Sequence, residues 1–293
     1  MNQNVLRDSS LQCLLLNARS IVNKFDIFEA YVSSSVPDII GVTESWSTPC
    51  IRDSELMLNG YDMFRCDRPT NNMGGGVLLY VRSELKPVEY LTRAKYPEHV
   101  WCRIKDVKNQ DLLIRVCYLS DNANIFAAKN HQDLVNLLNE VGSQHILVLG
   151  DFNYKDIDWN ANAGPQTSNG DCQMFIDCLE ENFLTQHVLV PTRESSILDL
   201  IISRDPDLVS NVQIIEKLAK SDHNMLTCTI HVDTSTVAES RIRFDYNKAD
   251  FEGFRRELNE VDWDTLLNGD THDCWMKIKM KIQKLEKAYV MFP

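Results

Sequence analysis

The sequence predicts an α/β (α+β) protein: a four-layered sandwich of two mixed β-sheets flanked by helices, with a C-terminal helical appendage. Short aliphatic and β-branched runs, each bounded by turn-forming residues, recur from residue 11 to residue 231. These runs follow one another directly as often as they alternate with helical segments. That order argues against a purely parallel βαβ repeat and favours two mixed sheets packed face to face.

The individual elements follow from apolar periodicity. Strands are expected at 11–17, 38–44, 75–81, 99–104, 111–119, 145–151, 198–203, 212–216 and 225–231. Helices are expected at 24–33, 127–141 and 171–183, because apolar residues recur there at three- and four-residue spacing. The segment 127–141 shows this most clearly in Leu134, Leu137, Leu138 and Val141.

The domain organisation follows from a change of composition near residue 232. Residues 1–10 are expected to be a flexible N-terminus, residues 11–232 the main domain, and the polar segment 233–241 a linker. Residues 242–293 are expected to be helical, with one helix opening at Lys248 or Ala249. The last helix carries Ile278, Ile282, Leu285 and Tyr289 on one face, with lysines between them. We interpret the lysines as a solvated basic face, with a nucleic-acid-binding arm as the alternative.

Composition excludes several classes of protein. With 44% hydrophobic residues the chain can bury a large core. The N-terminus lacks a cationic stretch followed by an apolar run, and the longest apolar runs are strand-sized. We therefore expect an intracellular protein, a monomer, without signal peptide or membrane segment. The nine scattered cysteines form no CxxC pair, which favours reduced thiols over disulfides or a zinc site. The net charge of −12 first argues against a nucleic-acid partner.

Polar side chains lie at the ends of the predicted strands. A carboxylate that ends a buried strand loses hydration unless a metal ion or hydrogen bonds compensate it. Several such residues suggest that the strands deliver ligands to one rim: Asn17, Glu44, Asp151, Asn153, Asp199, Asp222 and His223. Carboxylate and amide oxygens suit Mg²⁺ or Mn²⁺, and the absence of clustered Cys and His argues against zinc.

These residues, in this order, resemble a known superfamily. The series Asn17, DIIGVTE ending at Glu44, Tyr118, GDFN at 150–153, LDLI with Asp199, and SDH ending at His223 is similar to the endonuclease/exonuclease/phosphatase superfamily. This superfamily includes DNase I, apurinic endonucleases and sphingomyelinases. The resemblance runs from about residue 11 to residue 231.

A narrower resemblance is to the endonuclease domain of non-LTR retrotransposons, jockey-like and chicken-repeat-like elements in particular. It rests on NARSIVNK, PDIIGVTESW, the GGGV hairpin after FRCDRP, GDFN followed by IDW, and PTRESSILDLIIS. The segment 246–267 also resembles the connector between such an endonuclease and a reverse transcriptase. Because no reverse transcriptase follows, we expect a truncated element or a host gene derived from one, with a reverse transcriptase module as partner in a full-length element.

The resemblance implies a Mg²⁺-dependent DNA endonuclease, with Mn²⁺ as an alternative ion and nuclear access for work on DNA. Asp151 would orient or deprotonate the attacking water, with Asn153 beside it, while His223 would contact the scissile phosphate. Asp199 would hold the imidazole, and Tyr118 would contact the phosphate through its hydroxyl. The metal would be held by Glu44 and Asn17, with Asp222 as a further candidate. The implied product is a nick with a 3′-hydroxyl.

Basic residues near these segments are candidate contacts to the DNA backbone: Arg19, Lys24, Arg65, Arg68 and Arg82. Apurinic endonucleases usually carry an acidic or amide residue at the position of Arg19. The triple glycine at 74–76 is not a phosphate loop, because no GK[ST] follows it, and we expect it to allow a close approach of backbones. The whole charge excess belongs to residues 1–240, so we expect a local basic surface and weak, salt-sensitive DNA binding.

Two other readings stay open at this point. One keeps the superfamily but changes the substrate to RNA, an inositol phosphate or a phospholipid. The other is an inactive element-derived remnant that only binds, although no residue of the main catalytic set is missing from the sequence.

Overall fold

The computed structural model describes residues 10–68, 74–92, 96–105, 111–120, 127–140, 145–161, 164–232, 249–269 and 271–289. The expected linker at 233–241 lies outside these residues, as does the expected flexible N-terminus apart from Ser10. The chain divides into two compact units, Met1–Ser235 and Thr236–Pro293, which are described separately.

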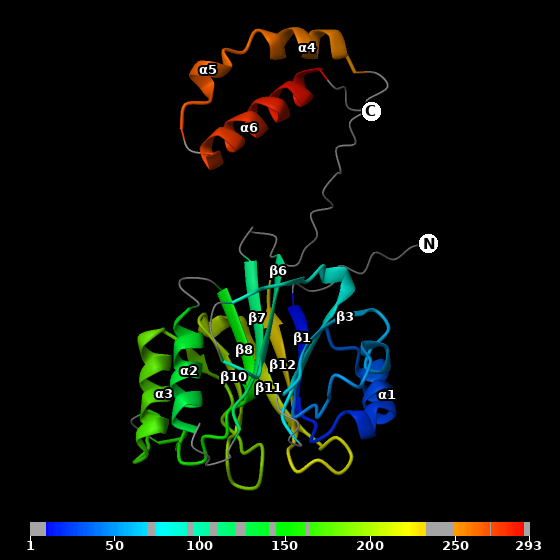
Figure 1. The fold of residues 1–293 in the computed structure, drawn as a ribbon. Helices are drawn as coiled ribbons and strands as arrows, with labels where there is room; N and C mark the ends of the chain where they lie inside the picture. The colour runs from blue at the N-terminus through cyan, green and yellow to red at the C-terminus, as the bar shows by residue number, and fades with distance from the viewer. Residues whose placement is uncertain are drawn as a thin grey trace. The chain divides into compact units, whose positions relative to one another are not determined.

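The first unit is built on two six-stranded mixed sheets that face each other (Figure 1). The first sheet has the order β11 (Val209–Ile215), β12 (Met225–His231), β1 (Ser10–Asn17), β2 (Ile39–Thr43), β4 (Val77–Arg82) and β3 (Tyr61–Cys66). The second has the order β5 (Val88–Glu89), β6 (His99–Lys105), β7 (Asp111–Tyr118), β8 (His145–Asp151), β10 (Asp199–Ser203) and β9 (Thr185–Gln186). The pairs β1–β2 and β7–β8 are parallel, and the other pairs are antiparallel.

Helices cover the outer faces of the sheets, so the predicted four-layered sandwich is confirmed (Figure 1). Helix α1 (Phe25–Ser35) packs Phe28 and Val32 against the first sheet. Helices α2 (Ala127–Asn139) and α3 (Gly170–Glu181) lie side by side over the second sheet. Short 3₁₀ turns occur at Val22–Lys24, Asp53–Glu55, Ser83–Leu85 and Pro206–Leu208.

The central strands are buried on both faces, which explains their nearly continuous apolar sequences. In β1, Cys13 and Leu15 point into the core between the sheets, whereas Leu14 and Leu16 point into the core under α1. This alternation is the two-residue period of a strand. Burial from both sides also leaves little water at the strand ends, where the polar residues of interest lie.

The structure adds elements that periodicity did not predict. Strand β3 lies at a sheet edge, and all its residues are exposed or half-buried, so it has no apolar pattern to detect. Strands β5 and β9 have only two residues each. Strand β11 begins at Val209 rather than at residue 212, because an irregularity between Ser210 and Gln213 breaks its alternation.

The second unit consists of α4 (Phe251–Asn259), α5 (Trp263–Leu266) and α6 (Thr271–Tyr289). Helix α4 begins later than the expected Lys248 or Ala249, because the Asp250 carboxylate accepts the backbone N–H of Gly253 and caps the helix there. Within the described residues, no helix has the length and apolar character needed to cross a membrane. All nine cysteines are free thiols.

Candidate active site

The topology brings the polar strand ends to one edge of the sandwich. The carboxyl ends of the parallel strands β1 and β2 meet at this edge, as do those of β7 and β8. Strand β10 runs antiparallel to β8, which places its first residue, Asp199, directly opposite Asp151. Strand β12 is antiparallel to β1, so the turn before Met225, with His223, reaches the same edge. Residues far apart in the sequence thus converge because strand direction sends them to the same rim.

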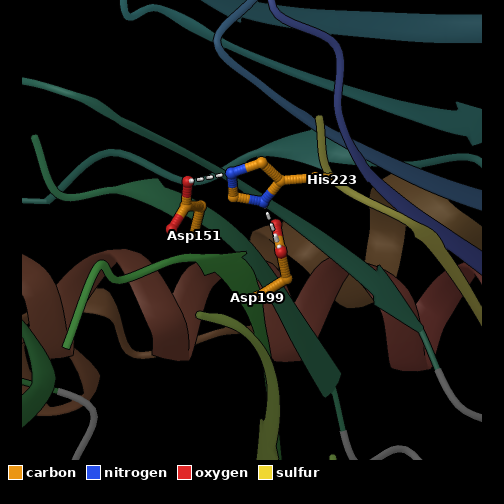
Figure 2. Close-up of side chains that lie close together, drawn as sticks. All are labelled: Asp151, Asp199 and His223. Atoms are coloured by element: carbon orange, nitrogen blue, oxygen red, sulfur yellow. Dashed lines mark hydrogen bonds and ion pairs between the residues drawn. The ribbon is translucent and has the colours of Figure 1, made fainter. Parts of the chain in front are cut away.

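His223 is held between two buried carboxylates. Figure 2 shows its imidazole between Asp151 and Asp199, with Nδ1 2.7 Å from Asp199 Oδ2 and Nε2 3.9 Å from Asp151 Oδ2. Because Asp199 occupies Nδ1, the other ring nitrogen, Nε2, is directed toward Asp151 and the rim. This is the arrangement in which a carboxylate orients a histidine and stabilises its charged form.

Protonation in this cluster departs from ordinary values. Burial opposes the charge of His223, but the hydrogen bond and charge of Asp199, helped by Asp151 and Asp222, outweigh it and raise the His223 pKa to about 9. Burial and the nearby charge of Asp199 raise the pKa of Asp151, against the opposing effects of His223 and Asn17. Shifted titration of this kind is common in catalytic sites.

Asn17 bridges two carboxylates rather than presenting an oxygen to a metal. Its Nδ2 donates to Asp151 Oδ2 at 2.8 Å and to Glu44 Oε1 at 3.0 Å, and its Oδ1 accepts the backbone N–H of Arg19 at 3.1 Å. The predicted role of Asn17 as a metal ligand stays a prediction, because its Oδ1 keeps a second lone pair beside the hydrogen bond from Arg19. The amide instead ties Glu44 to Asp151.

Glu44 lies at the centre of a set of donors. Besides Asn17, its carboxylate accepts from Trp46 Nε1 at 3.1 Å and from the Tyr118 hydroxyl at 3.3 Å. Glu44 is half-buried and its backbone has a left-handed φ of 48°, which turns the chain sharply after β2. Strained non-glycine residues of this kind cluster at functional sites.

Tyr118 and Asn153 lie where the sequence places them, at the ends of β7 and just after β8. Burial raises the pKa of Tyr118 far above its usual value, so its hydroxyl keeps its proton and acts as a donor. Asn153 has a left-handed φ of 51°. Its backbone N–H binds Asp151 Oδ1 at 3.1 Å, and its side chain donates to the carbonyl of Leu119 at 2.7 Å. Asn153 therefore connects the loops after β7 and β8.

Asp222 does not join the acidic cluster. Its Oδ2 lies 2.9 Å from Arg19 Nη1 and 2.8 Å from Arg193 Nη2. Two arginines neutralise this oxygen, and the predicted role of Asp222 as a further metal ligand stays a prediction. The same contacts explain why an arginine is accommodated at position 19.

The predicted DNA-contact residues separate into different places. Lys24 Nζ binds the carbonyls of Ala18 and Arg19, at 2.6 and 2.9 Å, and so supports the loop after β1. The side chain of Arg65 is 12% exposed and paired with Asp67, and that of Arg68 is 14% exposed and paired with Glu98.

Arg82 lies at the far end of β4 beside Asp38, at 3.5 Å. Arg65 is held by loop carboxylates and carbonyls, and Arg82 lies at the end of β4 away from the site edge, so a DNA contact by either residue stays a prediction.

Several residues that contact the site were not predicted as site residues. Trp46, which lies in the PDIIGVTESW motif, and Glu98 contact the site through hydrogen bonds. Ser221 is buried and donates to the carbonyl of Asn17 at 2.8 Å, which ties the turn before His223 to the end of β1. The SDH motif placed Ser221 in a known pattern but did not reveal this contact.

The donor set fits a hard divalent cation. Three carboxylates, Glu44, Asp151 and Asp199, are connected through Asn17 and His223, so the edge carries excess negative charge. Asp199 Oδ1 is buried and has no hydrogen-bond partner among the described residues. Ligand atoms of Asp151, Asp199 and His223 all lie within 4.8 Å of one another. Oxygen-rich sites of this kind suit Mg²⁺ or Mn²⁺ rather than zinc.

A cavity of about 340 Å³ lies next to this edge. It is formed by the loop after β8 and the loop before β10, and its lining includes Asp158, Trp159, Asn160, Pro191 and Ile197. Lys155, which also lines it, follows Asn153 by two residues, and Ile197 precedes Asp199 by two.

Comparisons with known proteins agree with this geometry. A family model described as endonuclease-reverse transcriptase matches residues 112–227, the stretch that contains Tyr118, Asp151, Asp199 and His223. No curated protein matches the sequence significantly.

Solved structures share the fold at low identity. The AP endonuclease LMAP from Leishmania major is 11% identical, covers 76% of this chain and 88% of its own, and has a TM-score of 0.61. The endonuclease domain of TRAS1, a telomere-specific non-LTR retrotransposon, is 14% identical, covers 76% of this chain and 99% of its own, and has a TM-score of 0.58. The 3′ phosphatase NExo from Neisseria, bound to a product DNA hairpin, is 14% identical, covers 74% and 98%, and has a TM-score of 0.57. The chain is therefore similar over residues 112–227 to the endonuclease-reverse transcriptase family, and over about three quarters of its length it shares the fold of AP endonucleases and of a non-LTR retrotransposon endonuclease.

Proposed function

We propose that the chain is a divalent-cation-dependent DNA endonuclease that hydrolyses a phosphodiester bond and leaves a 3′-hydroxyl. The observation that carries this proposal is the continuous set of hydrogen bonds and close charges from Asp199 through His223, Asp151 and Asn17 to Glu44 and Tyr118, all at one edge. This set offers an acid, a base and oxygen ligands within one site, which phosphodiester hydrolysis requires.

Asp151 is the proposed base. Its raised pKa makes it a better proton acceptor than an ordinary carboxylate, and its Oδ1 and Oδ2 are fixed by the Asn153 N–H and by Asn17. A water molecule beside Asp151 would lose its proton to this carboxylate as it attacks phosphorus. Asn17 and Asn153 therefore orient the base without titrating themselves.

His223 is the proposed phosphate ligand. With its pKa raised to about 9 it is protonated at neutral pH. Its Nε2–H can then donate to a non-bridging phosphate oxygen, while Asp199 holds the ring and stabilises its charge. The Tyr118 hydroxyl keeps its proton and donates it to Glu44 Oε1, so a contact between Tyr118 and the phosphate would require this proton to turn from Glu44 to the substrate.

Glu44 is the proposed main ligand of the cation, because it is half-buried and its carboxylate is oriented by several donors. The cation supplies charge neutralisation for the phosphoryl transition state and stabilisation of the leaving oxygen. Asp199 is less suited to this role, because its Oδ2 is engaged with His223 Nδ1.

DNA binding is proposed to rely on a small basic group within an acidic protein. Arg19 and Arg193 both pair with Asp222, the residue before His223, and their side chains are 51% and 32% exposed. Because the chain carries a net charge of −12, we expect weak affinity that falls steeply with salt. The matching family model is described as endonuclease-reverse transcriptase, and a nick with a 3′-hydroxyl would be a primer for a reverse transcriptase module.

The test is nicking of supercoiled plasmid with Mg²⁺ and with EDTA. Wild type is expected to nick only with Mg²⁺, and Asp151→Asn and Glu44→Gln are each expected to lower the rate about 10³-fold. The matched control is Asp111→Asn, which alters a half-buried carboxylate at the opposite end of β7 from Tyr118 and should nick like wild type.

The product is read with DNA ligase, which seals a nick that carries a 3′-hydroxyl and a 5′-phosphate. Failure of sealing would refute the proposed product. Equal rates for wild type, Asp151→Asn and Glu44→Gln would refute the assigned site. Release of phosphate from a 3′-phosphorylated oligonucleotide without nicking would reassign the chain to phosphatase chemistry, and no turnover of either substrate would indicate a remnant.

A further inference from the structure

The triple glycine at positions 74–76 has no part in the proposed mechanism, yet it lies against the segment that carries Glu44. The backbone N–H of Ser45 donates to the carbonyl of Gly76 at 3.1 Å, and that of Trp46 donates to the carbonyl of Gly75 at 2.9 Å. The glycines therefore hold the two residues that directly follow Glu44.

A buried ion pair lies beside the same glycines. Arg68 binds Glu98 through two nitrogens, Nε at 3.1 Å and Nη2 at 3.2 Å. The Glu98 carboxylate also accepts the backbone N–H of Gly76 at 2.8 Å, and Glu98 is only 7% exposed. A Cβ added to Gly75, whose φ is +70°, would overlap both the Glu98 carboxylate and the Arg68 guanidinium. Glycine is required there because the backbone packs directly on this ion pair.

The ion pair reaches Glu44 through Tyr118. The Arg68 guanidinium lies over the Tyr118 ring, 5.7 Å from its centroid, and the backbone N–H of Tyr118 donates to the Glu98 carbonyl at 3.0 Å. The Tyr118 hydroxyl then donates to Glu44 Oε1 at 3.3 Å. One oxygen of Glu44 is thus connected to Arg68 and Glu98 through a single aromatic ring.

The glycines reach the other oxygen of Glu44 through Trp46. Their carbonyls fix the backbone at Ser45 and Trp46, and Trp46 has a left-handed φ of 54°. This conformation turns the indole back so that its Nε1 donates to Glu44 Oε2 at 3.1 Å. Both oxygens of Glu44 are therefore oriented by residues that the glycines and the ion pair hold in place.

We propose that Gly74–Gly76, Arg68 and Glu98 form a glycine clamp that positions Tyr118 and Trp46 and thereby fixes the Glu44 carboxylate for a divalent cation. The inference rests on the proposed function in one respect, namely that Glu44 holds the cation. It makes Arg68 and Glu98 positioning residues and replaces the predicted role of Arg68 as a DNA contact. A carboxylate that is free to rotate binds a cation less tightly, and loss of such an outer partner typically costs 10–100-fold in metal affinity.

The first test measures Mn²⁺ binding without DNA, by the electron paramagnetic resonance signal of free Mn²⁺. Arg68→Met is expected to raise the Kd for Mn²⁺ about tenfold. The matched control is Arg103→Met, which removes an arginine paired with Asp111, at 3.1 Å, at the far end of β7 from Tyr118. Its Mn²⁺ affinity should stay within about twofold of wild type, because a half-buried ion pair at this end of β7 contributes little to folding and has no contact with Glu44.

A second variant guards against a folding defect. Trp46→Phe keeps an aromatic ring and removes only the N–H that donates to Glu44, and we expect a similar rise in Kd. Circular dichroism and the urea midpoint report whether each variant is folded. In nicking assays, Arg68→Met should raise the Mg²⁺ concentration for half-maximal rate by the same factor, with the rate at saturating Mg²⁺ retained.

A double-mutant cycle tests whether Arg68 acts through Tyr118. If it does, Arg68→Met combined with Tyr118→Phe should bind Mn²⁺ no more weakly than Tyr118→Phe alone. Additive losses would overturn the proposal. So would wild-type Mn²⁺ affinity in a folded Arg68→Met variant whose KM for DNA has risen, since this identifies Arg68 as a DNA contact.

Failure of the proposed function gives a different result. A wild type that binds Mn²⁺ but nicks no DNA refutes the endonuclease, while a lower Mn²⁺ affinity in Arg68→Met would still support the clamp. A wild type that binds no Mn²⁺ overturns the clamp itself.

Discussion

Replacing Asp199 by Asn tests the reasoning about the histidine most directly. The substitution keeps the shape of the side chain and leaves an oxygen that can accept from His223 Nδ1, but it removes the charge. Asp199 is fully buried and 2.7 Å from His223 Nδ1, so no solvent replaces the lost interaction. The change therefore isolates the electrostatic effect of one carboxylate on one imidazole.

The magnitude follows from the shifted titration. The His223 pKa rises from an ordinary 6.5 to about 9, with Asp199 the main cause that raises it against the opposing effect of burial. This rise corresponds to about 3 kcal/mol in favour of the charged imidazole. In Asp199→Asn, burial is opposed only by the weaker effects of Asp151 and Asp222, so we expect the His223 pKa to fall by at least about 2 units.

The sign of the stability effect can be worked out. A histidine whose pKa is higher in the folded state stabilises the fold fully below pH 6.5, and this contribution disappears as pH rises through about 9. Asp199→Asn should therefore be most destabilising near pH 6, by up to about 3 kcal/mol, and less so near pH 9. Removing Asp199 also lowers the pKa of Asp151, which stabilises the folded variant at higher pH. This second effect, too, makes the loss of stability in Asp199→Asn smaller near pH 9 than near pH 6.

The assay is a titration of the histidine Cε1–H signals by NMR in EDTA, with His223→Gln used to assign the resonance. Urea denaturation at pH 6 and pH 9 gives the stability difference. The matched control is Asp222→Asn, which removes a nearby carboxylate that is 28% exposed. Of the three carboxylates that raise the His223 pKa, Asp222 has the smallest effect, so this variant should lower the His223 pKa much less. An unchanged His223 pKa in Asp199→Asn, or an equal fall in both variants, would refute the assignment of Asp199.

The remaining predictions concern stability. Burial lowers the His99 pKa to about 4, so the free energy of unfolding should fall by up to about 3 kcal/mol as pH drops from 6.5 through 4. His99→Phe should remove this pH dependence of stability, measured by urea denaturation at several pH values. Arg115 is fully buried, and its Nε and Nη1 have no hydrogen-bond partner among the described residues. Because burying this charge costs free energy, Arg115→Met should leave the urea midpoint of unfolding unchanged or raise it, and a large fall in the midpoint would contradict this. Gly150→Ala should lower the free energy of unfolding by more than about 3 kcal/mol, measured by calorimetry, because the added Cβ would overlap the Cys117 carbonyl. In the control Gly170→Ala the added Cβ meets no atom within 4 Å, so the free energy of unfolding should not change.

Central strands and the outer helices were predictable because the signal is local. Strand β1 shows it: every second residue enters one core and the residues between enter the other, so the apolar run is visible without knowing any partner. Strand β3 shows the limit, since a half-exposed edge strand takes its conformation from pairing with β4 and not from its own pattern.

The candidate site was predictable as a set of residues but not as a set of contacts. Asn17, Glu44, Asp151, Asp199 and His223 all lie at strand ends in the sequence, and strand direction brings them to one edge. That Asn17 donates to two carboxylates while its oxygen accepts the Arg19 N–H depends on contacts that have no sequence signature.

Charged residues were the least predictable. Asp222 pairs with Arg19 across 203 positions of sequence and with Arg193 on another loop, so its apparent place in the acidic cluster could not be judged from the SDH motif. Likewise, Arg68 and Arg82 both flank the same hairpin, yet one stacks on Tyr118 and the other lies at the opposite end of the sheet.

The sequence by itself thus determined the sandwich class, the central strands and the polar residues at their ends, because periodicity and strand termini are properties of consecutive residues. Only the tertiary structure decided which carboxylates meet, which arginines neutralise them and why three glycines follow one another beside Glu98. Those outcomes depend on the register of strands distant in sequence, and electrostatic interaction depends on separation in space, which a linear pattern does not contain.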